Sequence, residues 1–278
     1  MAIQTTSTSA SAWSPDTHVF AAQDVLPGAL ILDNSTVSGT ILGDEPALRV
    51  ATVADDTAAV VAEGAPIDEA DATLGEVVVR TAKIGQLHKL SFEQWSQPNV
   101  SQVLAASAGR AITRKADELF ISGTTSDAST GLTNVPGIVA GDPVTGSLDS
   151  LVDLVAQLQA NGAQPTSILL SPSAWAEVRK VKTGEGAATS LLGVGATDAQ
   201  PLLMGIPVRV TAALAEGTGL VVDRTAIVSA TSTVNVASSE HAAFDSDSIM
   251  LRATWRIGWA AVHADRIGSF QVTAPAAG

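Results

Sequence analysis

The stretch AAVVAEGAPIDEADATLGEVVVRTAKIGQLHKLS, residues 58–91, decides how the rest of the chain is interpreted. Valines at 60–61 and at 77–79 flank a segment that glycine and proline interrupt. Because β-branched residues favour strands and these breakers favour a turn, the pattern predicts a hairpin. Its tip, residues 63–73, is much longer than a common hairpin loop. We therefore expect an extended arm whose tip is either functional or disordered.

The tip of this hairpin is acidic. It contains no lysine or arginine, and the next basic residue is Arg80. Such a loop can attract a basic surface, although a simply solvated and mobile tip explains the same charges. Its spacing misses that of a calcium-binding loop, so no metal site is expected. The acidic residues are Glu63, Asp68, Glu69 and Asp71.

Composition indicates a globular protein with an extensive core. The chain has 278 residues, of which 46% are hydrophobic, enough for one large domain or two ordinary ones. A net charge of -13 argues against nucleic-acid binding through the bulk surface. The lack of cysteine excludes disulfides, thiolate metal sites and cysteine nucleophiles. No long apolar window and no signal-peptide pattern occur, so we expect a soluble, non-secreted protein.

After Pro98 the apolar residues change to helical spacing. The segment NVSQVLAASAGRAITRKADELFISG, residues 99–123, has a plausible N-cap in Asn99 and a plausible stop in Gly123. A helix of about 22 residues would be ~33 Å long, which is a strut rather than an ordinary helix of a compact domain. Its polar side carries Arg110, Arg114 and Lys115.

The middle of the chain alternates helix and strand patterns. A helix is predicted over residues 147–162, a strand over 167–171 and a short helix after Pro172, which together suggest a small α/β layer. The glycine-rich segment KTGEGAATSLLGVGATDAQ, residues 182–200, predicts a mobile surface loop. Short strands are expected again near 208–210 and 220–222.

The chain reads as strands from Thr231 onward. In SIMLRATWRI, residues 248–257, apolar residues alternate with polar ones, so one face is buried and the other displays Arg252 and Arg256. Gly258 predicts a turn or bulge, after which WAAVHAD is expected to return as an antiparallel partner.

Sequence traces of enzymes are missing. GVGATD, residues 193–198, lacks the third glycine of a dinucleotide-binding loop, and no phosphate-binding loop or nucleophile elbow occurs. SEHAAFDSD, residues 239–247, gathers triad-type residues, but triad members normally converge from distant segments. The histidines have no zinc-enzyme spacing. We therefore expect no catalytic residues, no cofactor and no metal; the histidines are His18, His88, His241 and His263.

The order of these parts resembles the major capsid proteins of tailed bacteriophages, which have the α+β Hong Kong 97-type fold. The resemblance rests on the ordered set and on no single motif. The stretches that carry it are AAVVAEGAPIDEADATLGEVVVRTAKIGQLHKLS, VLAASAGRAITRKADELFISG with GLTNVPGI, SILLSPSAWAEVRKVK, and PLLMGIPVRVT with DSIMLRATWRIGWAAVHADRIGSF.

The resemblance implies a division of the chain into parts. These are an N-terminal arm (1–47), an extended hairpin loop (48–92), the spine helix with the first part of the peripheral domain (93–147), the axial domain (148–230) and the second part of the peripheral domain (231–278).

The resemblance also implies a function and partners. The chain would self-assemble into hexamers and pentamers of an icosahedral virion shell that encloses double-stranded DNA without binding it specifically. Some relatives carry a long scaffolding domain before the hairpin. Because only about 47 residues precede the hairpin in this sequence, the resemblance implies a separate scaffolding protein. A portal and a decoration protein are further expected partners, a membrane is not, and assembly would take place in the cytoplasm of the bacterial host. Some members of the resembled family link subunits covalently through a lysine of this loop and an asparagine of a neighbour. Because residues 63–73 contain no lysine, the resemblance implies a shell without covalent links.

Two other classes stay open at this point. Encapsulin-type nanocompartments share the fold but begin with an amphipathic helix, where this chain has TTSTSASAWSPDTH. A glycan-acting or adhesion β protein is disfavoured by the missing signal peptide and catalytic clusters. If the chain forms a shell, the acidic tip of one subunit is expected to meet a basic surface of the next, either Arg252 with Arg256 or the helical set Arg110, Arg114 and Lys115.

Overall fold

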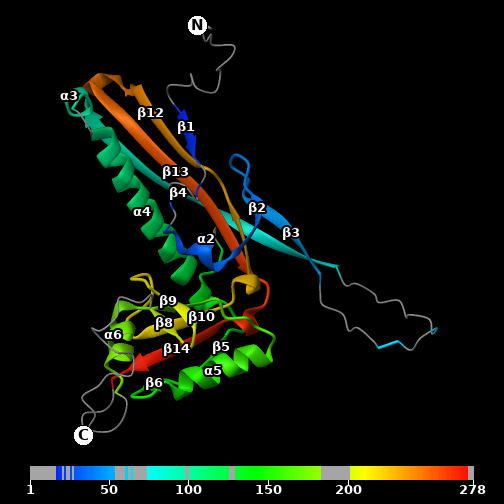
Figure 1. The fold of residues 1–278 in the computed structure, drawn as a ribbon. Coiled ribbons are helices and arrows are strands. Elements are labelled where there is room, and N and C mark those ends of the chain that lie inside the picture. Colours follow the sequence, from blue (N-terminus) through cyan, green and yellow to red (C-terminus); the bar gives the residue numbers. More distant parts are fainter. Residues whose placement is uncertain are drawn as a thin grey trace, which may run out of the picture.

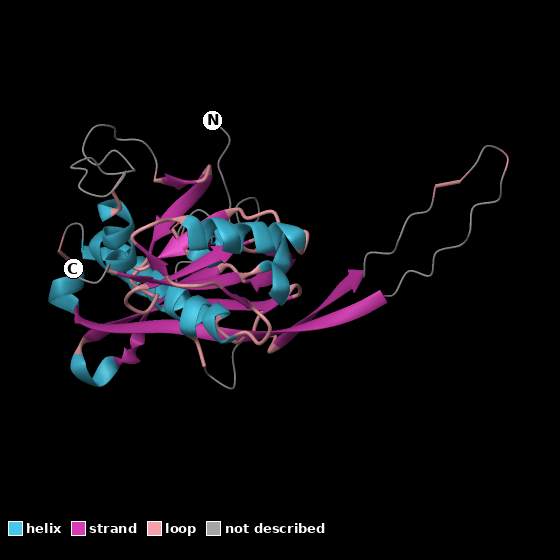
Figure 2. Cartoon of the chain, turned by 90° about the horizontal axis from the view of Figure 1, so that it is seen from below, coloured by secondary structure: helices cyan, strands magenta, loops and turns pink. Residues whose placement is uncertain are grey.

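The computed structural model shows two β-sheets joined by a long helix, with a two-stranded arm that leaves the body (Figures 1 and 2). The residues that it describes are 17–20, 22, 26, 28–53, 60–61, 64, 74–97, 100–124, 129–182 and 201–274.

The first sheet has seven strands. Its main path runs β1-β12-β13-β11-β2, and β4 pairs with both β13 and β3. All pairs are antiparallel except β2 with β11. The strands are β1 (Thr17–Phe20), β2 (Thr36–Thr40), β3 (Ala47–Val53), β4 (Leu74–Ser91), β11 (Ile227–Thr231), β12 (Val234–Ala243) and β13 (Ser248–Ala261).

Strand β4 belongs to both the arm and the body. Its first residues, up to Arg80, pair with β3 and form the arm, whereas its residues from Thr81 onward pair with β13. The sequence predicted the arm correctly, but it placed the first strand at valines 60–61. Those valines lie outside the strands, because the register pairs Val50 with Val77 and Val53 with Leu74.

The spine helix α4 (Val100–Ser122) confirms the predicted strut. Its 23 residues would span ~35 Å. The side that packs into the first core carries Ala108, Ile112, Ala116 and Phe120, which recur every four residues. Phe120 meets Trp259 of β13 edge to face, with ring centroids 5.5 Å apart.

The second sheet runs β5-β14-β10-β7-β9-β8, with β6 beside β14. Strand β7 is buried along its whole length, and α5 buries Leu154 and Leu158 against this core. The elements are β5 (Val139–Ala140), β6 (Val144–Thr145), α5 (Asp149–Ala160), β7 (Ser167–Leu170), α6 (Pro172–Lys180), β8 (Leu202–Leu203), β9 (Ile206–Val210), β10 (Thr218–Val222) and β14 (Gly268–Thr273).

The C-terminal strands differ from the sequence prediction. Residues 259–261 continue β13 instead of turning back, so WAAVHAD is not its antiparallel partner. Gly258 lies inside β13, where an added Cβ would overlap the carbonyl oxygen of Arg80. The glycine therefore permits a close approach of two backbones and does not make a turn. The last strand, β14, then joins the second sheet beside β10, so the range 231–278 contributes to both sheets.

Part of the predicted N-terminal arm is built into the body. Helix α2 (Leu30–Asn34) buries Ile31 completely, and β2 pairs with β11 in the first sheet. The segment is tied down because its apolar residues fill the core beside α4. An ion pair between Asp33 and Arg209 of β9, 2.7 Å long, also links it to the second sheet. Most of the predicted mobile loop, residues 183–200, lies outside the described residues.

Candidate functional site

The predicted contact residues fall into three groups in the structure. The four acidic residues of the tip, Glu63, Asp68, Glu69 and Asp71, lie outside the described residues. The helical set lies on α4, and the arginine pair lies on β13. Because the residues of β13 that alternate with the arginines pack into the same core as α4, Arg252 and Arg256 face the opposite side of the sheet from the helix. The two basic sets therefore form separate surfaces.

The helical set is only partly available. Lys115 forms an ion pair of 2.9 Å with Glu118 on the same helix. Arg110 and Arg114 are exposed and line a groove of about 1050 Å³ between α4 and the segment after β9. Asp117 and Glu118 also line this groove, and their negative charges offset the positive charges of the two arginines.

Asp117 holds the start of α2. Its Oδ1 accepts a hydrogen bond of 2.8 Å from the backbone N–H of Leu30. Burial raises the pKa of Asp117 to about 6, although this hydrogen bond acts in the opposite direction. The carboxyl group therefore titrates well above an ordinary aspartate and joins the spine helix to the N-terminal part of the core.

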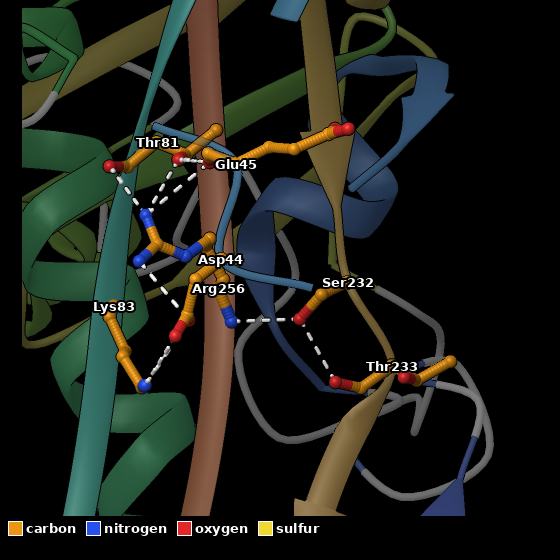
Figure 3. A network of polar contacts seen from close by, with 7 residues as sticks. All are labelled: Asp44, Glu45, Thr81, Lys83, Ser232, Thr233 and Arg256. Carbon is orange, nitrogen blue, oxygen red and sulfur yellow. Dashed lines mark hydrogen bonds and ion pairs between the residues drawn. The ribbon is translucent and has the colours of Figure 1, made fainter. Parts of the chain in front are cut away.

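The two arginines of β13 have different environments although they share one face. The Arg252 side chain is exposed and forms no hydrogen bond or ion pair within the part of the chain that the structure describes. The Arg256 side chain is only 15% exposed. Its Nη1 donates to Thr81 Oγ1 at 2.9 Å and, at 3.4 Å, to the carbonyl oxygens of Thr81 and Glu45 (Figure 3).

Asp44 completes a charged cluster around Arg256. Its Oδ1 lies 3.4 Å from Arg256 Nη2 and 3.2 Å from Lys83 Nζ (Figure 3). The hydrogen bond and charge of Lys83, with a smaller contribution from Arg256, hold the pKa of Asp44 below its usual value despite some desolvation. Lys83 pairs with Arg256 across β4 and β13. The sequence did not single out Asp44 or Lys83, because only the strand register brings them together.

A groove of about 270 Å³ opens beside this cluster. Its lining includes Lys83, Arg252 and Arg256 against the single carboxylate of Asp44. Three cations and one anion leave a positive balance, so the groove suits an additional carboxylate. It contains no histidine, cysteine or glutamate. The arrangement supports ion pairing rather than acid–base or nucleophilic chemistry.

The described residues hold no cluster of histidine, aspartate or glutamate that could bind a metal ion. In the same part of the chain, no helix is both long and apolar enough to cross a membrane.

A projecting hairpin, a spine helix and two sheets make up an α+β fold that matches the Hong Kong 97-type fold of phage capsid proteins. Residues 30–271 match the Phage capsid family. The chain belongs to this family. It is a structural component of a virion capsid rather than an enzyme.

Solved structures support the fold. The capsid of an empty GTA particle has 18% identity and a TM-score of 0.69, with 88% of this chain and 90% of that chain covered. A Mycobacterium phage Ogopogo structure has 18% identity and a TM-score of 0.62, with 88% and 92% covered. A Mycobacterium phage Adephagia structure has 15% identity and a TM-score of 0.65 over the full length of both chains. No curated protein matches this chain.

Proposed function

We propose that the chain is the major capsid protein of a tailed bacteriophage and assembles into hexamers and pentamers of an icosahedral shell around double-stranded DNA. The observation that carries this proposal is the β3–β4 arm. Its strands pair with each other, and apolar side chains on it stay exposed, such as Leu74 (76%) and Val78 (50%). An arm that buries little within its own chain gains stability from a neighbouring subunit.

We propose that the two sheets form the two domains of such a subunit. We assign the first sheet with α4 to the peripheral domain and the second sheet with α5 and α6 to the axial domain. In this assignment β11 belongs to the peripheral domain and β14 to the axial domain, so the chain crosses between them more often than the sequence suggested.

The acidic tip of one arm would meet the face of β13 that carries Arg252 and Arg256 on the next subunit. Among the basic candidates, Arg252 is the most available, because Arg256 is engaged within its own chain and the helical set is offset by Asp117 and Glu118. Each exposed pair contributes only about 0–1 kcal/mol. Repeated at every boundary between subunits, such pairs would direct assembly and make it sensitive to salt.

Charge reversal tests this pairing. The double variant Asp68→Lys with Glu69→Lys should weaken assembly, and Arg252→Glu should partly restore it. The matched control is Arg110→Glu, which places the same reversal on the spine helix. Restoration by Arg110→Glu instead would identify α4 as the partner surface. Normal assembly of the reversed tip at low and high salt would show that the tip is merely solvated.

Electron microscopy of the purified protein tests the function itself. We expect closed shells or rings of subunits from the purified protein. In infected cells a separate scaffolding protein would assist assembly, and the particles would contain DNA. The portal and a decoration protein are further proposed partners. Monomers under all conditions would refute a shell, and protein cargo instead of DNA would favour an encapsulin-type compartment. The net charge of -13 suits a container that does not bind its DNA tightly.

A further inference from the structure

Arg256 ties together three segments that are distant in sequence. Through Thr81 it contacts β4 at the first residue that pairs with β13, and through Asp44 and the carbonyl oxygen of Glu45 it contacts the segment that leads into β3. Its backbone N–H donates to Ser232 Oγ at 2.9 Å, between β11 and β12. The guanidinium group therefore lies where both strands of the arm leave the body (Figure 3).

The place where the two strands of the arm leave the body, at Glu45, Pro46 and Thr81, is called the arm root here. Hydrogen bonds within the arm root reinforce these contacts. Thr81 Oγ1 accepts from Arg256 and donates to the carbonyl oxygen of Glu45 at 2.6 Å. The backbone N–H of Thr81 also donates to the carbonyl oxygen of Pro46 at 2.9 Å. The two strands of the arm are thus joined to each other and to β13 at one place.

Ser129 provides a second tie where β4 separates from β13. Its hydroxyl group accepts a hydrogen bond of 2.9 Å from the backbone N–H of Trp259 and donates one of 2.9 Å to the carbonyl oxygen of Arg80. Ser129 is buried, so loss of its hydroxyl would leave both backbone groups without this partner. It bridges two strands at the point where their direct pairing ends after Gly258 and Thr81.

We propose that Arg256 and Ser129 are positioning residues that set the direction in which the arm leaves the subunit. Arg256 braces the arm root through Thr81 and Glu45, and Ser129 closes the fork between β4 and β13. The consequence for assembly rests on the proposed function, whereas the effect on the arm itself belongs to the single subunit. This role differs from the contact between subunits that the sequence suggested for Arg256.

The geometry of the arm explains why its root matters. From Leu74 to Arg80 the strand spans ~20 Å at about 3.3 Å per residue. A tilt of about 10° at the root would move the far end of this strand by roughly 3.5 Å over that length. Such a displacement exceeds the length of a hydrogen bond, so an unbraced arm would miss its partner groups on a neighbour.

The chemistry of arginine suits this position. Its planar group donates from several nitrogens in fixed directions, which lets Nη1 serve Thr81 and Glu45 while Nη2 serves Asp44. A lysine offers a single ammonium group and would not reach all of these acceptors in the same way. The ion pairs of Asp44 are the more salt-sensitive contacts of the cluster, because the Asp44 side chain is 71% exposed. The hydrogen bonds to Thr81 are less sensitive, because Thr81 is buried.

Distance measurements between two spin labels test the proposal. Because the chain has no cysteine, Ala51→Cys on the arm and Gln157→Cys on α5 give unique labelling sites. In unassembled full-length subunits, Arg256→Met is expected to broaden the distance distribution or shift it by about 2 Å. Ala51 pairs with Glu76, ~13 Å from Arg80, where a tilt of about 10° gives that displacement. The matched control, Arg252→Met on the same face of the same strand, is expected to leave it unchanged. An unchanged distribution in Arg256→Met would overturn the proposal.

Two further variants keep the test decisive if Arg256→Met does not fold. Thr81→Val and Ser129→Ala remove only a hydroxyl group from each tie, and each is expected to broaden the same distribution. If both folded variants give the distribution of the parent protein, the positioning role is wrong.

Particle yield then separates this inference from the proposed function. Shells from the parent protein, with a clear loss of yield in Arg256→Met, would support both. If the parent forms no shell while the arm still shifts in Arg256→Met, the proposed function fails and the positioning role stands. If the arm shifts but the yield of shells does not change, the claim that arm direction guides assembly is overturned.

Discussion

Identical residues four positions apart on β13 have different roles because of their surroundings. Arg252 and Arg256 have the same chemistry and the same face in the sequence pattern, and the structure confirms the shared face. Only Arg256 lies beneath the segment that leads into β3, where Asp44 and Glu45 supply acceptors. The sequence could not separate the two arginines, since the distinction depends on a chain segment more than two hundred positions away.

Asp117 predicts a dependence of subunit stability on pH. Its pKa rises from 3.8 to about 6 in the folded chain, so the folded state binds more protons than the unfolded state between these values. The stabilising contribution of the group is therefore complete below pH about 4 and is lost as the pH rises through about 6. Asp117→Asn keeps an oxygen for the Leu30 N–H and should raise the free energy of unfolding at pH 7–8 by roughly 1 kcal/mol, a value reduced for partial exposure.

Denaturant titrations of unassembled subunits from pH 4 to pH 8 provide the measurement. The parent protein should lose stability relative to Asp117→Asn as the pH increases. Glu118→Gln, an exposed change at the next position, is the control. A constant difference between Asp117→Asn and the parent across this range would contradict the expected titration.

At the scale of elements, Gly258 predicts that the crossing of β4 and β13 tolerates no side chain. In Gly258→Ala the new Cβ would overlap the carbonyl oxygen of Arg80 and force the strands apart. We expect a loss of about 1–3 kcal/mol in the free energy of unfolding. The matched control is Gly85→Ala on β4, whose Cβ would meet Thr254 Cγ2 at 3.5 Å and the carbonyl oxygen of Ala253 at 3.9 Å, both ordinary contacts. Equal midpoints of urea unfolding for both variants would show that the backbones of β4 and β13 separate without loss of stability.

The N-terminal elements predict a sharp boundary for truncation. Removal of residues 1–16 leaves every described strand and helix in place and should not change the melting temperature of the subunit. Removal of residues 1–40 also deletes α2 and β2, and with them the buried Leu30 and Ile31, so the truncated chain should be severely destabilised. Thermal unfolding followed by circular dichroism compares the two. A folded subunit after the longer deletion would mean that α2 and β2 are dispensable to the core.

Elements with a local pattern were predictable from the sequence. The apolar repeat of α4 and the strict alternation of β13 each follow from neighbours within a few residues, and both are confirmed. The partner of β4 was placed wrongly because the valines at 60–61 and the segment 47–53 offer similar β-branched patterns, and only long-range pairing decides between them. The return of β14 to the second sheet was missed for the same reason.

For the whole molecule, the candidate site was harder to predict than the fold. The sequence identified the exposed basic residues and the acidic tip, but a cluster such as Asp44, Lys83 and Arg256 arises only when three segments meet. No local pattern marks such a meeting. The end of the N-terminal arm was equally hard to predict, since the burial of Ile31 depends on α4 being in place.

The lack of a lysine in the tip leads to a prediction for the assembled shell. If no covalent link forms between subunits, denatured shells should separate into chains of 28.2 kDa. Electrophoresis of boiled, detergent-treated shells measures this directly, with unassembled subunits as the reference. Ladders of higher mass would show covalent links through other residues.

The continuity of β4 also has a mechanical consequence. A neighbour that pulls on the arm along its axis loads the strand lengthwise, and the load passes directly into the ladder between β4 and β13, from Thr81 to Ser91. In that direction the backbone hydrogen bonds resist sliding together, whereas a sideways pull would open them one after another. The subunit is therefore stiffest toward tension along its own arm. In the proposed shell, where a neighbour would hold the arm, stretching the shell would load the subunit in this direction.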